Sequence, residues 1–190
     1  MAETGCLKDG NFQNLQVEGL LTGNKINVKN ITTATTVLTD ADSGCICTIN
    51  VGSNVATTIT LPAITSSNIG TYYEFFIGTE NTGGIDILTA STDDATGDTF
   101  VGAIKIEINA AWGADNAQDD GVFYLLASGD HNQINMTGAE ENGAGEVGSY
   151  VRCVAISYSS AGHSLWQVTG LLGTDDPNGN GTAIFVDRDA

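Results

Sequence analysis

The residues best suited to bind a cation lie near the C-terminus. In the run DPNGNGTAIFVD, oxygen-bearing side chains occupy alternate positions at Asp176, Asn178 and Asn180, and Asp187 stands at the twelfth place. This spacing is the outline of a calcium-binding loop, although Asp187 replaces the usual bidentate Glu and only one earlier ligand is charged. Pro-Asn-Gly-Asn-Gly is also typical of a turn between strands. We expect no cofactor, with calcium at this loop as the alternative.

Two histidines and several acidic pairs are the other residues that could support catalysis. His131 lies in a polar stretch and His163 in a Ser-Ala-Gly-His turn, and neither adjoins a nucleophile or zinc-protease motif. We expect both to be exposed loop residues. Acidic pairs could act as glycosidase carboxylates, but their acid-rich loops favour solvated charge. These pairs are Asp93 and Asp94, Asp119 and Asp120, and Glu140 and Glu141. Asp98, with the first pair, is a weaker cation candidate. We therefore predict no enzymatic activity.

The four cysteines do not form a recognisable metal or disulfide pattern. They are Cys6, Cys45, Cys47 and Cys153. Cys45 and Cys47 alternate along one predicted strand, so their side chains point the same way, which is poor geometry for a bond between them. Convergent Cys and His spacing for zinc is absent from the sequence. We expect buried free thiols in a protein made in the cytosol.

Charge limits the classes of partner. Twenty-three acidic and six basic residues give a formal net charge of −17 over 190 residues. Nucleic acid binding depends on basic residues that release counterions, so we expect no nucleic acid partner. An anionic membrane surface would repel the chain, no apolar run approaches the ~20 residues of a membrane helix, and no secretory signal is visible. The acidity favours either solubility or a basic partner.

The elements that must position these residues are short strands. Within Thr35–Ile77, runs of β-branched and aromatic residues alternate with turn residues. In Cys45–Val51 every second residue is apolar, and a period of two indicates strand rather than helix. Strands are expected at Thr35–Leu38, Cys45–Val51, Thr57–Leu61, Tyr72–Ile77, 85–89, 100–108, 122–126, 150–158, 165–168 and 182–186. We predict an all-β fold, an antiparallel β-sandwich or barrel-like domain over residues 34–190. The strand aromatics Tyr72, Tyr73, Phe75, Phe76 and Trp166 are assigned to its core.

Residues 1–33 are expected to form an extended N-terminal arm with short strands. Glycines divide it into pieces that bury little alone, so we expect it to lie on a neighbouring copy or partner; a fraying terminus is the alternative. Its candidate partner-binding residues are Leu7, Phe12, Leu15, Val17 and Leu20. Trp112, in the polar stretch 110–121, either contacts a partner or folds back on the sheet. The stretch 128–149 is expected to be a long loop, either functional or disordered.

Four short motifs resemble a known protein family. They are Ala41-Asp-Ser-Gly44, Leu61-Pro-Ala63, Gly70 with Tyr72–Ile77, and Trp166-Gln-Val-Thr-Gly170. Together they resemble small β-rich virion proteins of tailed bacteriophages, of the head decoration (cement) or head-fibre type. The resemblance implies a homotrimer made in the host cytoplasm and bound to the major capsid protein on the capsid exterior, without enzymatic activity. The alternative function is a head-fibre or tail-tip adhesion module that binds a receptor or glycan through the polar loops.

Overall fold

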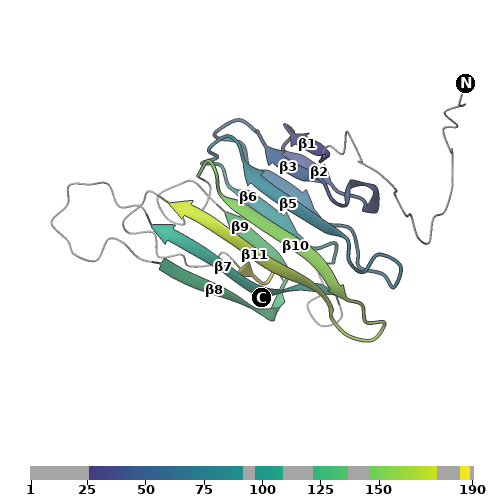
Figure 1. Cartoon of the computed structure of the whole chain (residues 1–190). Helices are drawn as coiled ribbons and strands as arrows, with labels where there is room; N and C mark the ends of the chain where they lie inside the picture. Colours follow the sequence, from purple (N-terminus) through teal and green to yellow (C-terminus); the bar gives the residue numbers. More distant parts are fainter. Residues whose placement is uncertain (1–25, 92–96, 109–121, 137–145, 175–184, 189–190) are drawn as a thin grey trace, which may run out of the picture.

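Two β-sheets packed face to face make up the fold (Figure 1). The computed structural model describes residues 26–91, 97–108, 122–136, 146–174 and 185–188. The seven-stranded sheet has the order β1 (Val28–Ile31), β3 (Ile46–Ile49), β5 (Tyr72–Ile77), β10 (Tyr150–Ser157), β11 (Ser164–Thr174), β7 (Asp98–Ile108), β8 (Val122–His131). The five-stranded sheet has the order β12 (Phe185–Val186), β9 (Gln133–Met136), β6 (Ile85–Leu88), β4 (Thr57–Thr60), β2 (Thr35–Val37). The prediction of an all-β sandwich is confirmed.

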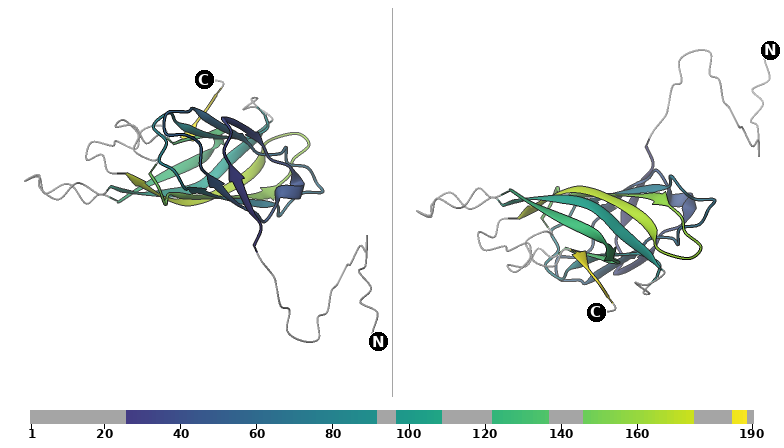
Figure 2. Two further views of the ribbon diagram at one scale, coloured as in Figure 1. Left: turned by 90° about the horizontal axis from the view of Figure 1, so that it is seen from above. Right: turned by 90° about the horizontal axis from the view of Figure 1, so that it is seen from below.

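The first six strands wind around the core instead of forming hairpins. Consecutive strands alternate between the sheets, so β1, β3 and β5 pair in parallel in one sheet and β2, β4 and β6 in the other. Figure 2 shows the two sheets as layers. The expected antiparallel pairing is therefore wrong for this half. It holds for β5 with β10, β10 with β11, β7 with β8, β6 with β9, and β9 with β12, whereas β11 and β7 are parallel.

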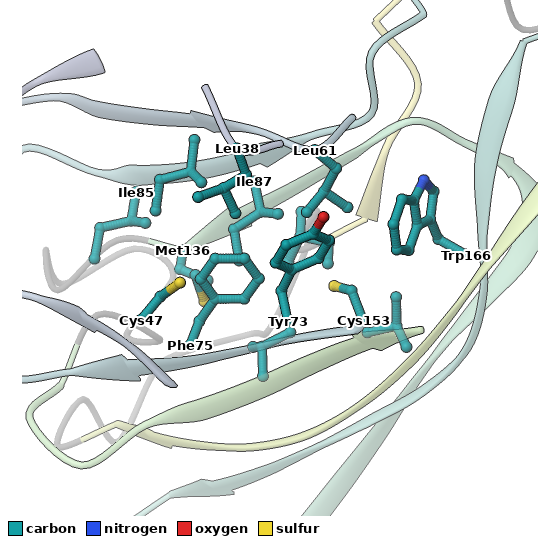
Figure 3. Close-up of a cluster of buried hydrophobic side chains, with 14 of the residues drawn as sticks. Leu38, Cys47, Leu61, Tyr73, Phe75, Ile85, Ile87, Met136, Cys153 and Trp166 are labelled. Carbon is teal, nitrogen blue, oxygen red and sulfur yellow. The ribbon is translucent and has the colours of Figure 1, made fainter. Parts of the chain in front are cut away.

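Along the strands, every second side chain faces the core, as the sequence predicts. Cys47, Ile49, Ile59 and Ile87 are fully buried between the sheets, and their sequence neighbours point outward. Figure 3 shows Tyr73 and Phe75 reaching from β5 towards side chains of the opposite sheet, with Trp166 beyond them. Burying each large apolar side chain contributes about 1.5–3 kcal/mol, which explains why the sequence pattern and the observed faces agree. The larger members of the core are Trp166, Tyr73, Phe75, Phe100, Ile31, Leu38, Leu61, Ile85 and Ile104.

Two segments differ from the sequence-based expectation. The stretch 128–149 is not one long loop, because β8 continues to His131 and β9 occupies Gln133–Met136. The predicted arm, residues 1–33, contains β1, which pairs with β3 and belongs to the seven-stranded sheet. Residues 1–25 lie outside the described ranges, so the prediction for the remainder of the arm is untested.

Candidate functional site

The outward face of the seven-stranded sheet carries a cluster of aromatic side chains. Along β5, alternation buries Tyr73 and Phe75, and directs Tyr72 and Phe76 to the outside. The register places Phe76 opposite Tyr150 of β10. The assignment of all β5 aromatics to the core is therefore wrong for Tyr72 and Phe76. Because a strand has a period of two, an unbroken run of aromatic residues must expose half of them, and this signal was available in the sequence.

A charged pair lies within this cluster. Glu74 and Arg152 face each other across β5 and β10, with 3.6 Å between Arg152 Nε and Glu74 Oε1. We call Tyr72, Glu74, Phe76, Tyr150 and Arg152 the aromatic face. Both charged side chains remain partly exposed, so the pair contributes no more than about 1 kcal/mol to folding. Its placement therefore suits recognition better than stability.

The aromatic rings hold this pair in position. The Phe76 and Tyr150 ring centroids are 4.8 Å apart, and the guanidinium carbon of Arg152 lies 4.9 Å from the centre of the Tyr72 ring. The Tyr150 hydroxyl donates to Glu74 Oε1 at 3.4 Å. Burial, followed by the charge of Glu74, raises the pKa of Tyr150. The phenol is therefore neutral at physiological pH and serves as a hydrogen-bond donor.

Arg152 retains unused donor capacity within the part of the chain that the structure describes. Its Nε atom is buried and forms no hydrogen bond there, since the Glu74 oxygen lies slightly too far away. A guanidinium carries five N–H donors in a fixed plane. The buried Nε is out of reach of a partner, but the side chain as a whole is 42% exposed, so the outer N–H groups of the guanidinium can donate to a carboxylate or a backbone carbonyl of a partner.

Further apolar side chains extend the face over neighbouring strands. Leu171 of β11 lies beside Tyr150 and is 44% exposed, and the half-buried Ile46 of β3 lies beside Glu74. The partly exposed Tyr, Phe and Arg side chains of this continuous surface are of the residue types that dominate protein–protein interfaces. The surface is thus suited to bind another protein.

An open cavity of about 370 Å³ lies at the sheet end where β7 and β11 begin. The charged residue that lines this cavity is Asp98, which is only 7% exposed. Asp98 Oδ2 accepts a hydrogen bond from the Ile64 N–H at 2.8 Å, and the Ser164 side chain also forms a hydrogen bond with the Asp98 carboxylate. Burial raises the pKa of Asp98 despite these hydrogen bonds. The carboxylate thereby ties the segment after β4 to the starts of β7 and β11, which is a structural role.

Most of the predicted metal and partner residues lie outside the described ranges. Of the calcium candidate only Asp187 is described, so a site formed with Asp176, Asn178 and Asn180 stays a prediction. The same holds for the acidic pairs and for Leu7, Phe12, Leu15, Val17, Leu20 and Trp112. Within the described ranges, no three or more His, Cys, Asp or Glu side chains gather as metal ligands.

The structure describes both histidines and three of the four cysteines, so the predictions for these residues can be compared with it. His131 ends β8, with its ring centroid 5.9 Å from that of Phe185, and it is half-buried, as is His163. The expectation of exposed loop histidines is therefore wrong for His131, which ends a strand; His163 lies in the loop before β11 as expected, but it is half-buried and not exposed. Cys45, Cys47 and Cys153 are buried free thiols, as predicted, and Cys6 lies outside the described residues.

Comparison of the chain with protein-family models, with curated proteins and with solved structures finds no match. Over the described ranges, no helix is long and apolar enough to cross a membrane. The aromatic face is therefore interpreted from its own geometry and chemistry.

Proposed function

We propose that this chain is a virion structural protein that decorates and stabilises the outer surface of a tailed-bacteriophage capsid, binding the major capsid protein through the aromatic face. The observation that carries the proposal is the cluster of three partly exposed aromatic rings around Arg152 on a continuous sheet surface. The family resemblance of the strand motifs supports the choice of partner.

Binding would act mechanically. A specific protein interface buries about 1,200–2,000 Å² in total, and the outward side chains of β3, β5, β10 and β11 provide one continuous area for such a contact. The aromatic rings would supply most of the affinity, since a few central aromatic and Arg residues dominate typical interfaces. Arg152 would donate to an acceptor on the capsid protein, and its charge would partly offset repulsion between this acidic chain and an acidic capsid surface.

The test is binding to empty heads assembled from a tailed-phage major capsid protein encoded in the same genome. We expect the chain to co-sediment with these heads and to raise their melting temperature. Arg152→Ala and Tyr150→Ala should each weaken binding by about 30-fold, equivalent to ~2 kcal/mol at a central interface residue. Thr58→Ala, which alters an outward residue of the five-stranded sheet, is the matched control and should bind as the wild type does.

Two results would contradict the proposal. The first is no binding to the heads, together with binding to host cells or to a glycan array, which would favour the adhesion module. The second is binding to the heads that neither aromatic-face substitution weakens, which would place the contact elsewhere on the chain.

A further inference from the structure

Within the described residues, both sheets end in an edge strand at the same end of the sandwich, paired with a neighbour on one side only. Among the described strands, β1 is the last member of the seven-stranded sheet and β2 the last member of the five-stranded sheet. Figure 1 shows β1 and β2 together at one end, with β8 at the other. The described part of the chain therefore presents two free sheet edges side by side, one from each layer.

The free edge of β1 can be assigned residue by residue. The carbonyls of Asn27 and Ile31 accept hydrogen bonds from Ile46 and Asn50 of the β3 segment at 2.9 and 2.8 Å. Alternate residues of a strand direct their backbone groups to the same side. Val28 and Asn30 therefore direct their N–H and C=O groups away from β3, off the edge of the sheet.

The same assignment holds for β2. The Ala34 carbonyl accepts from Thr58 N at 2.8 Å, and Leu38 N donates to the Thr60 carbonyl at 2.9 Å. Thr35 and Val37 thus direct their backbone groups off the edge. Together the two edges present four donors and four acceptors that no neighbouring strand in the described structure satisfies, and of these groups the Thr35 carbonyl accepts a hydrogen bond from Thr33 Oγ1 at 3.0 Å.

These edges carry only part of the protection that natural edge strands have. Such strands are often kept short or guarded by proline and by charged side chains, including inward-pointing ones. β1 and β2 are short and Lys29 of β1 points inward, but its charge is paired with Asp42 at 2.7 Å and neither strand contains proline. Ile26, Val28 and Val37 are 67%, 64% and 65% exposed at this end. The edges therefore combine unpaired backbone groups with uncovered apolar side chains.

We propose that a second copy of this chain pairs with this end, β1 against β1 and β2 against β2, in antiparallel fashion about a twofold axis. A single extended peptide could satisfy only one edge, because stacked sheets lie about 10 Å apart. A second copy presents two edges with the same separation, so it satisfies both at once. The pairing joins each sheet to its counterpart and closes after two subunits.

A head-to-tail arrangement fits less well. It would pair β1 and β2 with the opposite end of the sandwich, where β8 has ten residues and β12 has two. These lengths do not match the four and three residues of β1 and β2. The geometry therefore points to a dimer, whereas the family resemblance implies a trimer. This inference does not depend on the capsid proposal.

Sedimentation velocity of the full chain over a range of concentrations tests the dimer. We expect the wild type to dimerise and the double variant Val28→Pro, Val37→Pro to dissociate at least 30-fold more readily, because proline removes two edge-facing donors without affecting the bonds to β3 and β4. The matched variant Val28→Thr, Val37→Thr keeps both donors and should still dimerise. A wild type that is monomeric or trimeric, or a proline variant that dimerises equally well, overturns the proposal.

Amide hydrogen exchange of the wild-type chain tests the same edges without substitution. The amides of Val28, Asn30, Thr35 and Val37 should be protected at high protein concentration and should exchange faster after dilution. Rapid exchange of these amides in a concentrated sample overturns the proposal. Protection that does not change on dilution also overturns it, because a segment of the same chain would then cover the edge.

Discussion

Gly102 offers the sharpest test of the backbone arrangement beside the aromatic face. It lies on β7 opposite Val168 of β11, in the parallel pair next to the β8 edge of the seven-stranded sheet. Its φ of +134° is one that residues with a side chain rarely adopt. A Cβ placed there would lie 2.1 Å from the Val168 carbonyl oxygen and 3.0 Å from its nitrogen. We therefore predict that Gly102→Ala destabilises the fold strongly.

Two costs add at this position. Holding a non-glycine residue at an unfavourable φ costs about 1–3 kcal/mol. Accommodating a methyl group against backbone atoms forces the strands apart, and such overpacking typically costs a further ~1–3 kcal/mol. The sum of about 2–6 kcal/mol is a large share of the 5–15 kcal/mol by which a domain of this kind is typically stable. A flexible side-chain tip could swing away, but the contacted atoms are backbone, so the upper half of this range is expected.

Urea unfolding measures the loss, and two other glycines separate its causes. Gly70 has φ +92° with nothing within 4 Å of an added Cβ, so Gly70→Ala carries the backbone cost alone. Gly170 has no such φ, but its Cβ would lie 2.5 Å from the Tyr150 carbonyl oxygen, so Gly170→Ala carries the contact cost alone. The loss for Gly102→Ala should approach the sum of the other two. A loss no greater than that of Gly70→Ala would refute the reasoning.

Three further predictions concern buried side chains. Because burial raises the pKa of Asp98, the folded protein binds a proton at this carboxyl group more tightly than the unfolded chain does. Asp98→Asn, which carries no charge, should therefore be more stable than the wild type at pH 7. In urea melts this difference in stability should shrink as the pH falls through the raised pKa. Burial raises the pKa of Cys47 to about 12 and also raises that of Cys153, so peptide mapping should show neither thiol labelled by a thiol reagent at pH 8 until the protein unfolds. Trp166 is fully buried and its indole N–H forms no hydrogen bond within the described residues; in urea melts Trp166→Phe should therefore cost less than half of the ~3–5 kcal/mol expected for Trp166→Ala.

Strand positions could be predicted from sequence wherever alternation was strong. Tyr72–Ile77 was predicted with the observed bounds, and the alternate apolar residues Cys45, Cys47, Ile49 and Val51 of the predicted strand Cys45–Val51 prove to be buried. β9 was missed because its outward residues, Gln133 and Asn135, are amides typical of loops. In the fold both donate to Asp86 Oδ1, at 2.7 and 2.6 Å. Their role depends on a residue of β6 that only the fold brings near.

Strand pairing could not be predicted in the same way. Turn residues such as Asp40–Gly44 and Gly52–Asn54 show where a strand ends, and both were interpreted as tight turns between neighbouring strands. In the structure each connects one sheet with the other, so the next strand lies across the core. Alternation reveals which side chains are buried, but a strand buried on one face has the same pattern whichever neighbour it pairs with. Parallel winding therefore leaves no local trace in these sequences.

The two proposed binding surfaces also depend on pairing rather than on local sequence. Phe76 and Tyr150 meet only because β5 and β10 are neighbours, and β1 and β2 are edge strands because, among the described residues, they are the first strands of the winding. The surfaces lie at different places, since the aromatic face spans the middle of the seven-stranded sheet and the free edges lie at its end. A protein that bridges subunits of a lattice needs separate surfaces for the lattice and for its own copy. The aromatic face and the paired edges would meet this need without competing for the same residues, so each can be removed by substitution while the other is kept.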